Sequence, residues 1–171
     1  MAPYKASIAD VVKRFATSAE RVGLLKGLLA YRQALRASGV VDGFQWIDGS
    51  FVEDVERSRR RAPADIDLVT FASRPAAVDG PDLDVWLIQH GGLFDLDQTK
   101  AVFECDAFFV DLRKRGDLIV DDTRYWFGLF SHQRDTSLWK GMIQVPMFSD
   151  DDVALEFLEG LLFDVAEAPN A

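Results

Sequence analysis

Two aspartates, Asp65 and Asp67, stand one residue apart at the start of an apolar segment that extends to Phe71. Side chains alternate between the two faces of a β-strand, so both carboxylates would lie on the same face of a strand over residues 65–71. Aspartate is depleted in strands, and two like charges about 4 Å apart repel by roughly 4 kcal/mol at an effective dielectric constant near 20. A marginally stable domain tolerates this repulsion if a cation lies between the carboxylates. Oxygen ligands favour a hard divalent ion, Mg²⁺ or Mn²⁺.

A Gly-Ser pair, Gly49 and Ser50, follows a short strand predicted over residues 44–48. Gly49 permits a sharp turn and a close backbone approach, and Ser50 offers a hydroxyl. A helix that begins within residues 51–55 would direct free backbone N–H groups at an anion. We therefore expect a triphosphate to lie between Ser50 and the two aspartates.

The predicted strand 105–112, which reads CDAFFVDL, carries two further candidate carboxylates. Asp106 and Asp111 are an odd number of residues apart, so they point to opposite faces and only one can join the metal site. Asp106 stands where the strand opens, as Asp65 does, and is the predicted ligand. Asp111 stands where the strand ends and can bond a turn or the basic residues that follow. The alternative that both aspartates only cap the strand ends remains open.

The order Ile47-Asp48-Gly49-Ser50, a loop, and then Asp65-Ile66-Asp67-Leu68 resembles the nucleotidyltransferase superfamily that includes DNA polymerase β, and especially its minimal members. Asp48 stands where an apolar residue is more usual, and the loop is slightly long. The resemblance implies transfer of a nucleoside monophosphate from a nucleoside triphosphate to a hydroxyl, with release of pyrophosphate. It implies that Asp65, Asp67 and Asp106 are catalytic and bind two metal ions, and that Gly49 and Ser50 hold the phosphates.

Basic residues supply further candidates for the nucleotide site. Arg134 and Lys140 flank a polar loop, where a cation would neutralise a leaving pyrophosphate or would simply be surface charge. The loop between the two motif halves carries four arginines, which form either a solvated segment or a clamp on a polyphosphate or an RNA partner: Arg57, Arg59, Arg60 and Arg61. His90 and His132 lack neighbours at metal-ligand spacing, which argues against a zinc site.

The acceptor of the transfer is not encoded in a recognisable motif. The resemblance implies a protein, an RNA or a small molecule. A chain of 171 residues has little room for an acceptor pocket of its own, so we expect a contribution from a partner protein or from a second subunit in a homodimer. The alternative is a catalytically inactive nucleotidyltransferase-like module that binds a partner, for example as the antitoxin of a toxin.

Composition places the chain among globular proteins. Its length corresponds to a single domain over residues 1–171, with N-terminal helices in 1–39, a motif-bearing core in 40–148 and a C-terminal helix in 150–166. The net charge of −9 argues against non-specific nucleic-acid binding. One cysteine, Cys105, excludes an internal disulfide and suits a cytoplasmic protein, and no apolar segment approaches the length of a membrane span. The predicted fold is α/β (α+β), a small mixed sheet with helices mainly on the face opposite the carboxylates.

Overall fold

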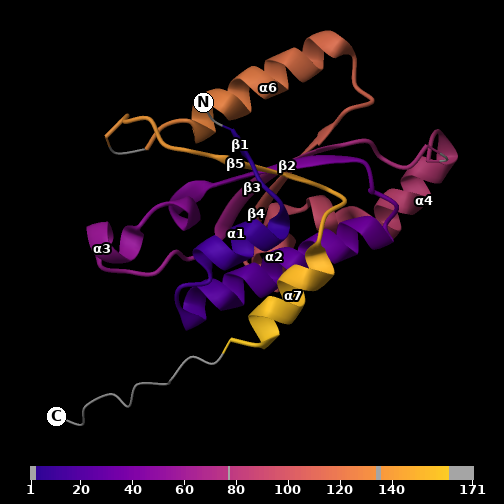
Figure 1. Ribbon diagram of the computed structural model, residues 1–171. Helices are drawn as coiled ribbons and strands as arrows, with labels where there is room; N and C mark the ends of the chain where they lie inside the picture. The colour runs from indigo at the N-terminus through magenta and orange to yellow at the C-terminus, as the bar shows by residue number, and fades with distance from the viewer. Residues whose placement is uncertain (1–2, 77, 134–135, 162–171) are drawn as a thin grey trace.

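The computed structural model describes residues 3–76, 78–133 and 136–161, and these contain seven α-helices and a five-stranded mixed sheet (Figure 1). The strand order is β1-β5-β2-β3-β4. β2 is antiparallel to both of its neighbours, whereas β1 runs parallel to β5 and β3 runs parallel to β4. The strands are β1 (Tyr4–Lys5), β2 (Gly43–Asp48), β3 (Ile66–Ala72), β4 (Cys105–Asp111) and β5 (Ile143–Pro146).

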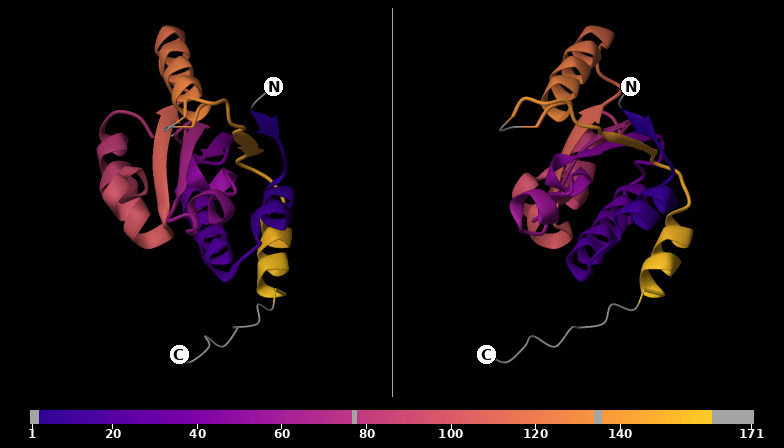
Figure 2. Two further views of the ribbon diagram at one scale, coloured as in Figure 1. Left: turned by 90° about the vertical axis from the view of Figure 1, so that its left-hand side faces the viewer. Right: turned by 60° about the vertical axis from the view of Figure 1, so that its left-hand side comes forward.

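Most helices cover one face of the sheet, where the larger hydrophobic core lies. Leu25, Leu28 and Leu35 form the buried stripe of the longest helix and pack with inward-facing strand residues such as Leu68 and Ala107. Figures 1 and 2 show this helical layer below the sheet. The helices that contribute to this core are α1 (Ile8–Phe15), α2 (Ala19–Ala37), α4 (Pro81–His90), α5 (Leu96–Phe103) and α7 (Asp151–Glu159).

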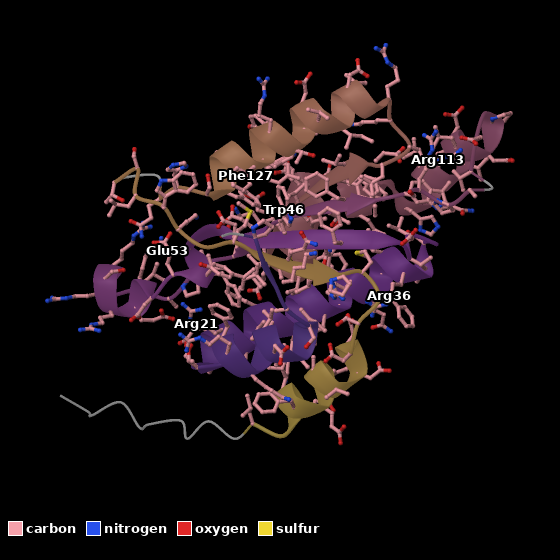
Figure 3. All side chains as sticks on the ribbon, turned by 45° about the horizontal axis from the view of Figure 1, so that its top comes forward. Arg21, Arg36, Trp46, Glu53, Arg113 and Phe127 are labelled. Atoms are coloured by element: carbon pink, nitrogen blue, oxygen red, sulfur yellow. The ribbon has the colours of Figure 1, made fainter. Side chains whose placement is uncertain are left out.

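The opposite face carries α6 (Gly116–Phe130), which crosses the sheet on the side away from α1, α2 and α7 (Figure 2). A smaller cluster of aromatic and aliphatic side chains fills the space between α6 and the strands. Figure 3 shows Trp46 and Phe127 facing one another there, with ring centroids 6.4 Å apart. Strand positions 46, 69, 71 and 110 belong to this cluster, so the same alternation that buries them directs their neighbours into the larger core.

A buried ion pair joins α7 to α2. Arg32 is fully buried and donates to both carboxylate oxygens of Asp151, at 2.7 and 2.9 Å, and to the side chain of Gln45 at 2.7 Å. Arg36 adds a second contact to Asp151 at 2.8 Å. Because every guanidinium nitrogen of Arg32 has an acceptor, the charge is compensated inside the core.

The predicted fold class is confirmed, and some element boundaries differ from those expected. Helix α2 is capped by Ser18, whose hydroxyl accepts from the Arg21 backbone N–H at 3.3 Å, because Ser18 has the extended conformation that an N-cap requires. The aromatic-rich sequence over residues 121–131 predicts a helix there, but α6 begins earlier, at Gly116, since three consecutive apolar residues in its first turns hide the helical period. β3 begins at Ile66, so Asp65 directly precedes the strand.

Other elements are shorter than predicted. The sequence over residues 141–148 predicts a strand, and β5 covers four of these residues. The two-residue β1 carries no sequence pattern by which it could be predicted. α7 ends at Glu159, and the end of the expected C-terminal helix lies outside the described residues. Within the part of the chain that the structure describes, no helix combines the length and apolarity that a membrane span needs.

Candidate functional site

Three aspartates stand side by side at one end of three neighbouring strands. Asp48 at the end of β2 pairs in register with Asp67 of β3, and Asp67 pairs in register with Asp106 of β4. Two residues further along the strands, Trp46, Val69 and Phe108 occupy the α6 face. The period of two in each strand therefore places all three carboxylates on the α6 face, opposite the main helical layer.

The Gly49 turn lies directly against Asp67. Gly49 has a φ of +77°, in the left-handed region, and a Cβ atom built on it would lie 1.7 Å from Asp67 Oδ2. No other residue type fits this turn without displacing the Asp67 carboxylate. Gly49 opens a short 3₁₀ helix, η1 (Gly49–Val52), which carries Ser50. The Gly-Ser turn and the Asp65/Asp67 segment, which are the two halves of the predicted motif, are therefore in direct contact through the Gly49 backbone and the Asp67 side chain.

A polar cavity of about 260 Å³, here named the Ser50 cavity, opens between these two halves. Its acidic wall comes from the predicted metal ligands and Glu53, and its basic wall comes from residues on three separate segments. The lining residues are Ser50, Glu53, Arg59, Arg61, Asp65, Asp67, Lys100, Asp106 and Lys140. Sequence reasoning grouped Asp65, Asp67 and Asp106 with Ser50 and Lys140, and all five line this one cavity.

Lys100 was missed in the sequence, because it lies on α5 and no local pattern connects it with the motif. Its ammonium lies 2.7 Å from Asp65 Oδ2 and 3.8 Å from Asp106 Oδ2. The hydrogen bond to the Asp65 carboxylate raises the pKa of Lys100. The lysine side chain is half exposed, so it holds this position at the mouth of the cavity and not in the core.

Asp48 is the carboxylate that departs from the motif, and it is buried. Its Oδ2 accepts from Lys140 Nζ at 2.7 Å, while Oδ1 has no hydrogen-bond partner among the described residues. Removal from water raises the pKa of Asp48 to about 6, and the bond to Lys140 offsets part of this rise. Lys140 also lies 3.7 Å from Glu53, so it links the end of β2 with the segment that leads to α3 (Val55–Arg59).

A second cavity, of about 350 Å³, adjoins two of the same carboxylates, Asp67 and Asp106. We name it the α6 cavity, because the last turn of α6 and the loop after it form much of its wall. It shares Asp67, Asp106 and Lys140 with the Ser50 cavity. Its remaining lining is more apolar and consists of Asp48, Phe108, Gly128, Leu129, Phe130, His132, Gln133 and Ser137.

The two aspartates of β4 occupy opposite ends of the strand. Asp106 pairs with Asp67, whereas Asp111 pairs with Ala72 and its Oδ1 accepts from the Arg113 backbone N–H at 2.9 Å. Figure 3 shows Arg113 at one end of the molecule and Glu53, which lines the Ser50 cavity, at the other. Arg134, the other predicted nucleotide-binding residue, lies outside the described residues.

A divalent cation is implied by the predicted site. Among the residues described, no group of three or more histidine, cysteine, aspartate or glutamate side chains is arranged to hold a metal ion. Mg²⁺ commonly uses one or two carboxylates together with the phosphates of a substrate, so a preformed group of three is not required. Asp67 and Asp106 are neighbours in one cavity, and the Lys100 ammonium already lies beside the second of them. This donor set fits a hard divalent cation.

Comparisons with known proteins place the chain in a family but assign no activity. No curated protein matches it, and no solved structure matches it. A family model described as "Family of unknown function (DUF6932)" matches residues 2–146, well over half of the chain. The protein therefore belongs to the DUF6932 family.

Proposed function

We propose that this protein transfers a nucleoside monophosphate from a nucleoside triphosphate to a hydroxyl group and releases pyrophosphate, with Mg²⁺ or Mn²⁺ bound at its carboxylates. The observation that carries the proposal is the close contact between the Gly49 turn and Asp67, where a Cβ atom would lie 1.7 Å from Oδ2, inside a cavity that also holds Ser50 and Asp106. A phosphate-binding turn and a carboxylate pair in direct contact suit the binding of a metal–triphosphate complex.

The basic wall of the Ser50 cavity supports a polyanionic ligand. Arg59, Arg61 and Lys100 face the same space as Ser50, in a chain whose net charge is −9. Cations gathered at one cavity of an acidic protein favour the approach of a negatively charged substrate to that cavity. Ser50 would donate its hydroxyl to a phosphate oxygen, and the arginines would compensate the charge of the leaving pyrophosphate.

Each carboxylate has a proposed part. Asp65 and Asp67 would hold the cation that accompanies the triphosphate, and Asp106 would complete the site and receive the proton of the attacking hydroxyl. Bound there, the cation supplies charge neutralisation and lowers the pKa of the hydroxyl. The Lys100 ammonium leaves Asp65 when the cation binds, which its exposed four-carbon stem allows.

A transfer assay tests the proposal. The protein is incubated with ATP labelled at the α-phosphate, Mg²⁺ or Mn²⁺, and a cell extract that is then separated into protein, RNA and small-molecule pools. We expect pyrophosphate release and label in one pool with the wild type and with Asp111→Asn, and neither with Asp67→Asn. Asp106→Asn should lose transfer while it keeps most of the nucleotide affinity, because Asp106 is proposed to serve the attacking hydroxyl. Activity that survives in Asp67→Asn would overturn the proposal.

A second function, a catalytically inactive module that binds a partner protein, is favoured by one observation. Lys100 compensates Asp65 and Asp106, and Lys140 compensates Asp48, so these carboxylates already have a cation from the chain itself. Stable nucleotide binding by the wild type without pyrophosphate release or labelling of any pool would support this function over the enzyme.

A further inference from the structure

We propose that the α6 cavity binds the acceptor of the transfer, and that the acceptor is a small alcohol with an apolar body. This inference rests on the proposed function and identifies the substrate class and the place where it binds. It also replaces the expectation that a chain of this length has little room for an acceptor pocket of its own.

The two cavities meet at the carboxylates and differ in everything else. Asp67, Asp106 and Lys140 line both. Beyond this shared wall the Ser50 cavity is basic and polar, whereas Phe108, Leu129 and Phe130 make the α6 cavity partly apolar. The donor and the acceptor of a group transfer must meet at the reacting atoms. Two cavities of different chemistry that share the carboxylates provide this arrangement, with the polyphosphate in one and the acceptor in the other.

The size of the α6 cavity limits the acceptor. Its volume of about 350 Å³ is close to the lower end of the range of about 300–1,000 Å³ found for small-molecule sites. Phe108 and Phe130 would contact the apolar part of the ligand, and the Asp106 carboxylate lies two residues from Phe108 on the same face of β4. This distribution of polar and apolar lining favours a molecule with one polar end.

Asp48 indicates which polar group the ligand carries at its polar end. Its side chain is only 3% exposed, it lines the α6 cavity, and its Oδ1 has no hydrogen-bond partner among the described residues. A buried acceptor without a partner is destabilising, the more so when the group is charged. A ligand hydroxyl supplies the missing donor, whereas a ligand carboxylate has no hydrogen to donate at neutral pH and would be repelled.

The transfer step follows from this placement. The acceptor oxygen forms a bond to the α-phosphorus, and the bond from that phosphorus to the bridging oxygen breaks, so pyrophosphate leaves with the electron pair. As the oxygen attacks, the hydroxyl turns from Asp48 to Asp106, and its proton passes to the Asp106 carboxylate, which lines both cavities. Product and pyrophosphate then leave through different cavities.

Gly128 provides a way to block the α6 cavity alone. It lies on α6 and lines the cavity, and a Cβ atom built on it would meet nothing within 4 Å. The first atom of a side chain therefore has room there, and Gly128→Leu should extend into the cavity and also remove a helix-interior glycine, which is unfavourable relative to other residues. Gly23→Leu is the matched control, because Gly23 lies inside α2 and its Cβ position is also open.

The experiment measures binding of 2-phenylethanol and of phenylacetate by saturation-transfer NMR. The two probes share a ring, but only the alcohol can donate to Asp48. We expect the wild type and Gly23→Leu to bind 2-phenylethanol at least ~10-fold more tightly than phenylacetate, and Gly128→Leu to lose the alcohol. Equal binding of both probes, no binding of the alcohol, or unchanged binding in Gly128→Leu would overturn the inference.

Nucleotide binding separates this inference from the proposed function. The affinity of Gly128→Leu for a non-hydrolysable ATP analogue with Mg²⁺ should equal that of the wild type. A ten-fold loss would mean that the α6 cavity holds part of the nucleotide, which contradicts the inference and leaves the proposed function standing. Label found only in the protein or RNA pool of the transfer assay would have the same meaning. A wild type that binds the alcohol but no nucleotide would contradict the proposed function and leave the alcohol site intact.

Discussion

At the scale of single residues, Gly49 determines the geometry of the site. Its φ of +77° and its contact with the Asp67 carboxylate leave no room for a side chain. Gly49→Ala should destabilise the fold by about 1–3 kcal/mol through backbone strain, and it should also displace the Asp67 carboxylate and weaken metal–nucleotide binding. Urea unfolding and titration with an ATP analogue measure the two effects.

Gly23→Ala is the control for this substitution, because Gly23 lies in a helix interior with open space around its Cβ position. It should stabilise the protein slightly and leave nucleotide affinity unchanged. If Gly49→Ala behaved in the same way, the close approach of the turn to Asp67 would have no part in binding.

Asp48 should make stability depend on pH. Burial raises the folded-state pKa of Asp48 to about 6, above its ordinary value of 3.8, so the protonated form is favoured by folding. The stability that this group contributes is present in full below pH 3.8 and is lost as the pH rises through about 6. The difference corresponds to about 3 kcal/mol at most.

Urea unfolding of the wild type and of Asp48→Asn in EDTA between pH 4 and pH 7.5 isolates this contribution. We expect the stability of the wild type to fall relative to that of Asp48→Asn as the pH rises through this range. A constant difference between the two proteins would show that Asp48 does not titrate there.

At the scale of elements, the short helix α3 divides the arginine run. Arg60 ends the helix in the left-handed conformation, with a φ of 54°. Of the four arginines of the run, Arg59 and Arg61 line the Ser50 cavity, whereas Arg57 and Arg60 are not among its lining residues. The run therefore presents one pair of charges to the proposed triphosphate and another pair outside it.

Two double variants, each of which removes two arginines and so changes the net charge equally, test this division. Arg59→Ser with Arg61→Ser should weaken binding of an ATP analogue about ten-fold at low ionic strength, and the effect should shrink in high salt. Arg57→Ser with Arg60→Ser should cause a much smaller loss. Equal losses in the two double variants would mean that only the overall charge of the segment matters.

The buried ion pair between Arg32 of α2 and Asp151 of α7 gives a prediction about stability alone. Asp151→Ala leaves the fully buried Arg32 guanidinium without its carboxylate, which should cost about 3 kcal/mol or more. Asp152→Ala, at an exposed neighbouring position, should cost less than about 0.5 kcal/mol. Comparable unfolding midpoints for the two variants would show that the buried pair does not anchor α7.

At the scale of the whole molecule, local sequence patterns predicted the helices and strands, whereas the topology of the sheet determined which residues meet at the candidate site. The motif grouped Asp65, Asp67 and Asp106 with Ser50, and all four line one cavity, because each stands at the start of a strand, directly before one or in the turn after one. Lys100 and the α6 cavity could not be predicted, since they depend on how α5 and α6 pack against the strands. Asp48 carried a signal, its place at the end of a predicted strand beside Gly49, but its pairing with Asp67 required the register of the sheet.

The separation of the two faces explains how one small domain carries both proposed substrates. The main core and its helices occupy one face, so among the residues of the site the stability of the fold depends mainly on Gly49 and Asp48. Among the described helices, α6 covers the other face, and the carboxylates lie at the end of the strands where its last turn leaves space. Variants of the other residues that line the two cavities should therefore change binding more than stability.

Metal-dependent nucleotide binding tests the central claim most directly. Isothermal titration of the wild type with a non-hydrolysable ATP analogue should give 1:1 binding in Mg²⁺ that is lost in EDTA and in Asp67→Asn, and is retained in Asp111→Asn, at the far end of β4. Binding of equal strength in EDTA, or in Asp67→Asn, would contradict a metal–nucleotide site at these carboxylates.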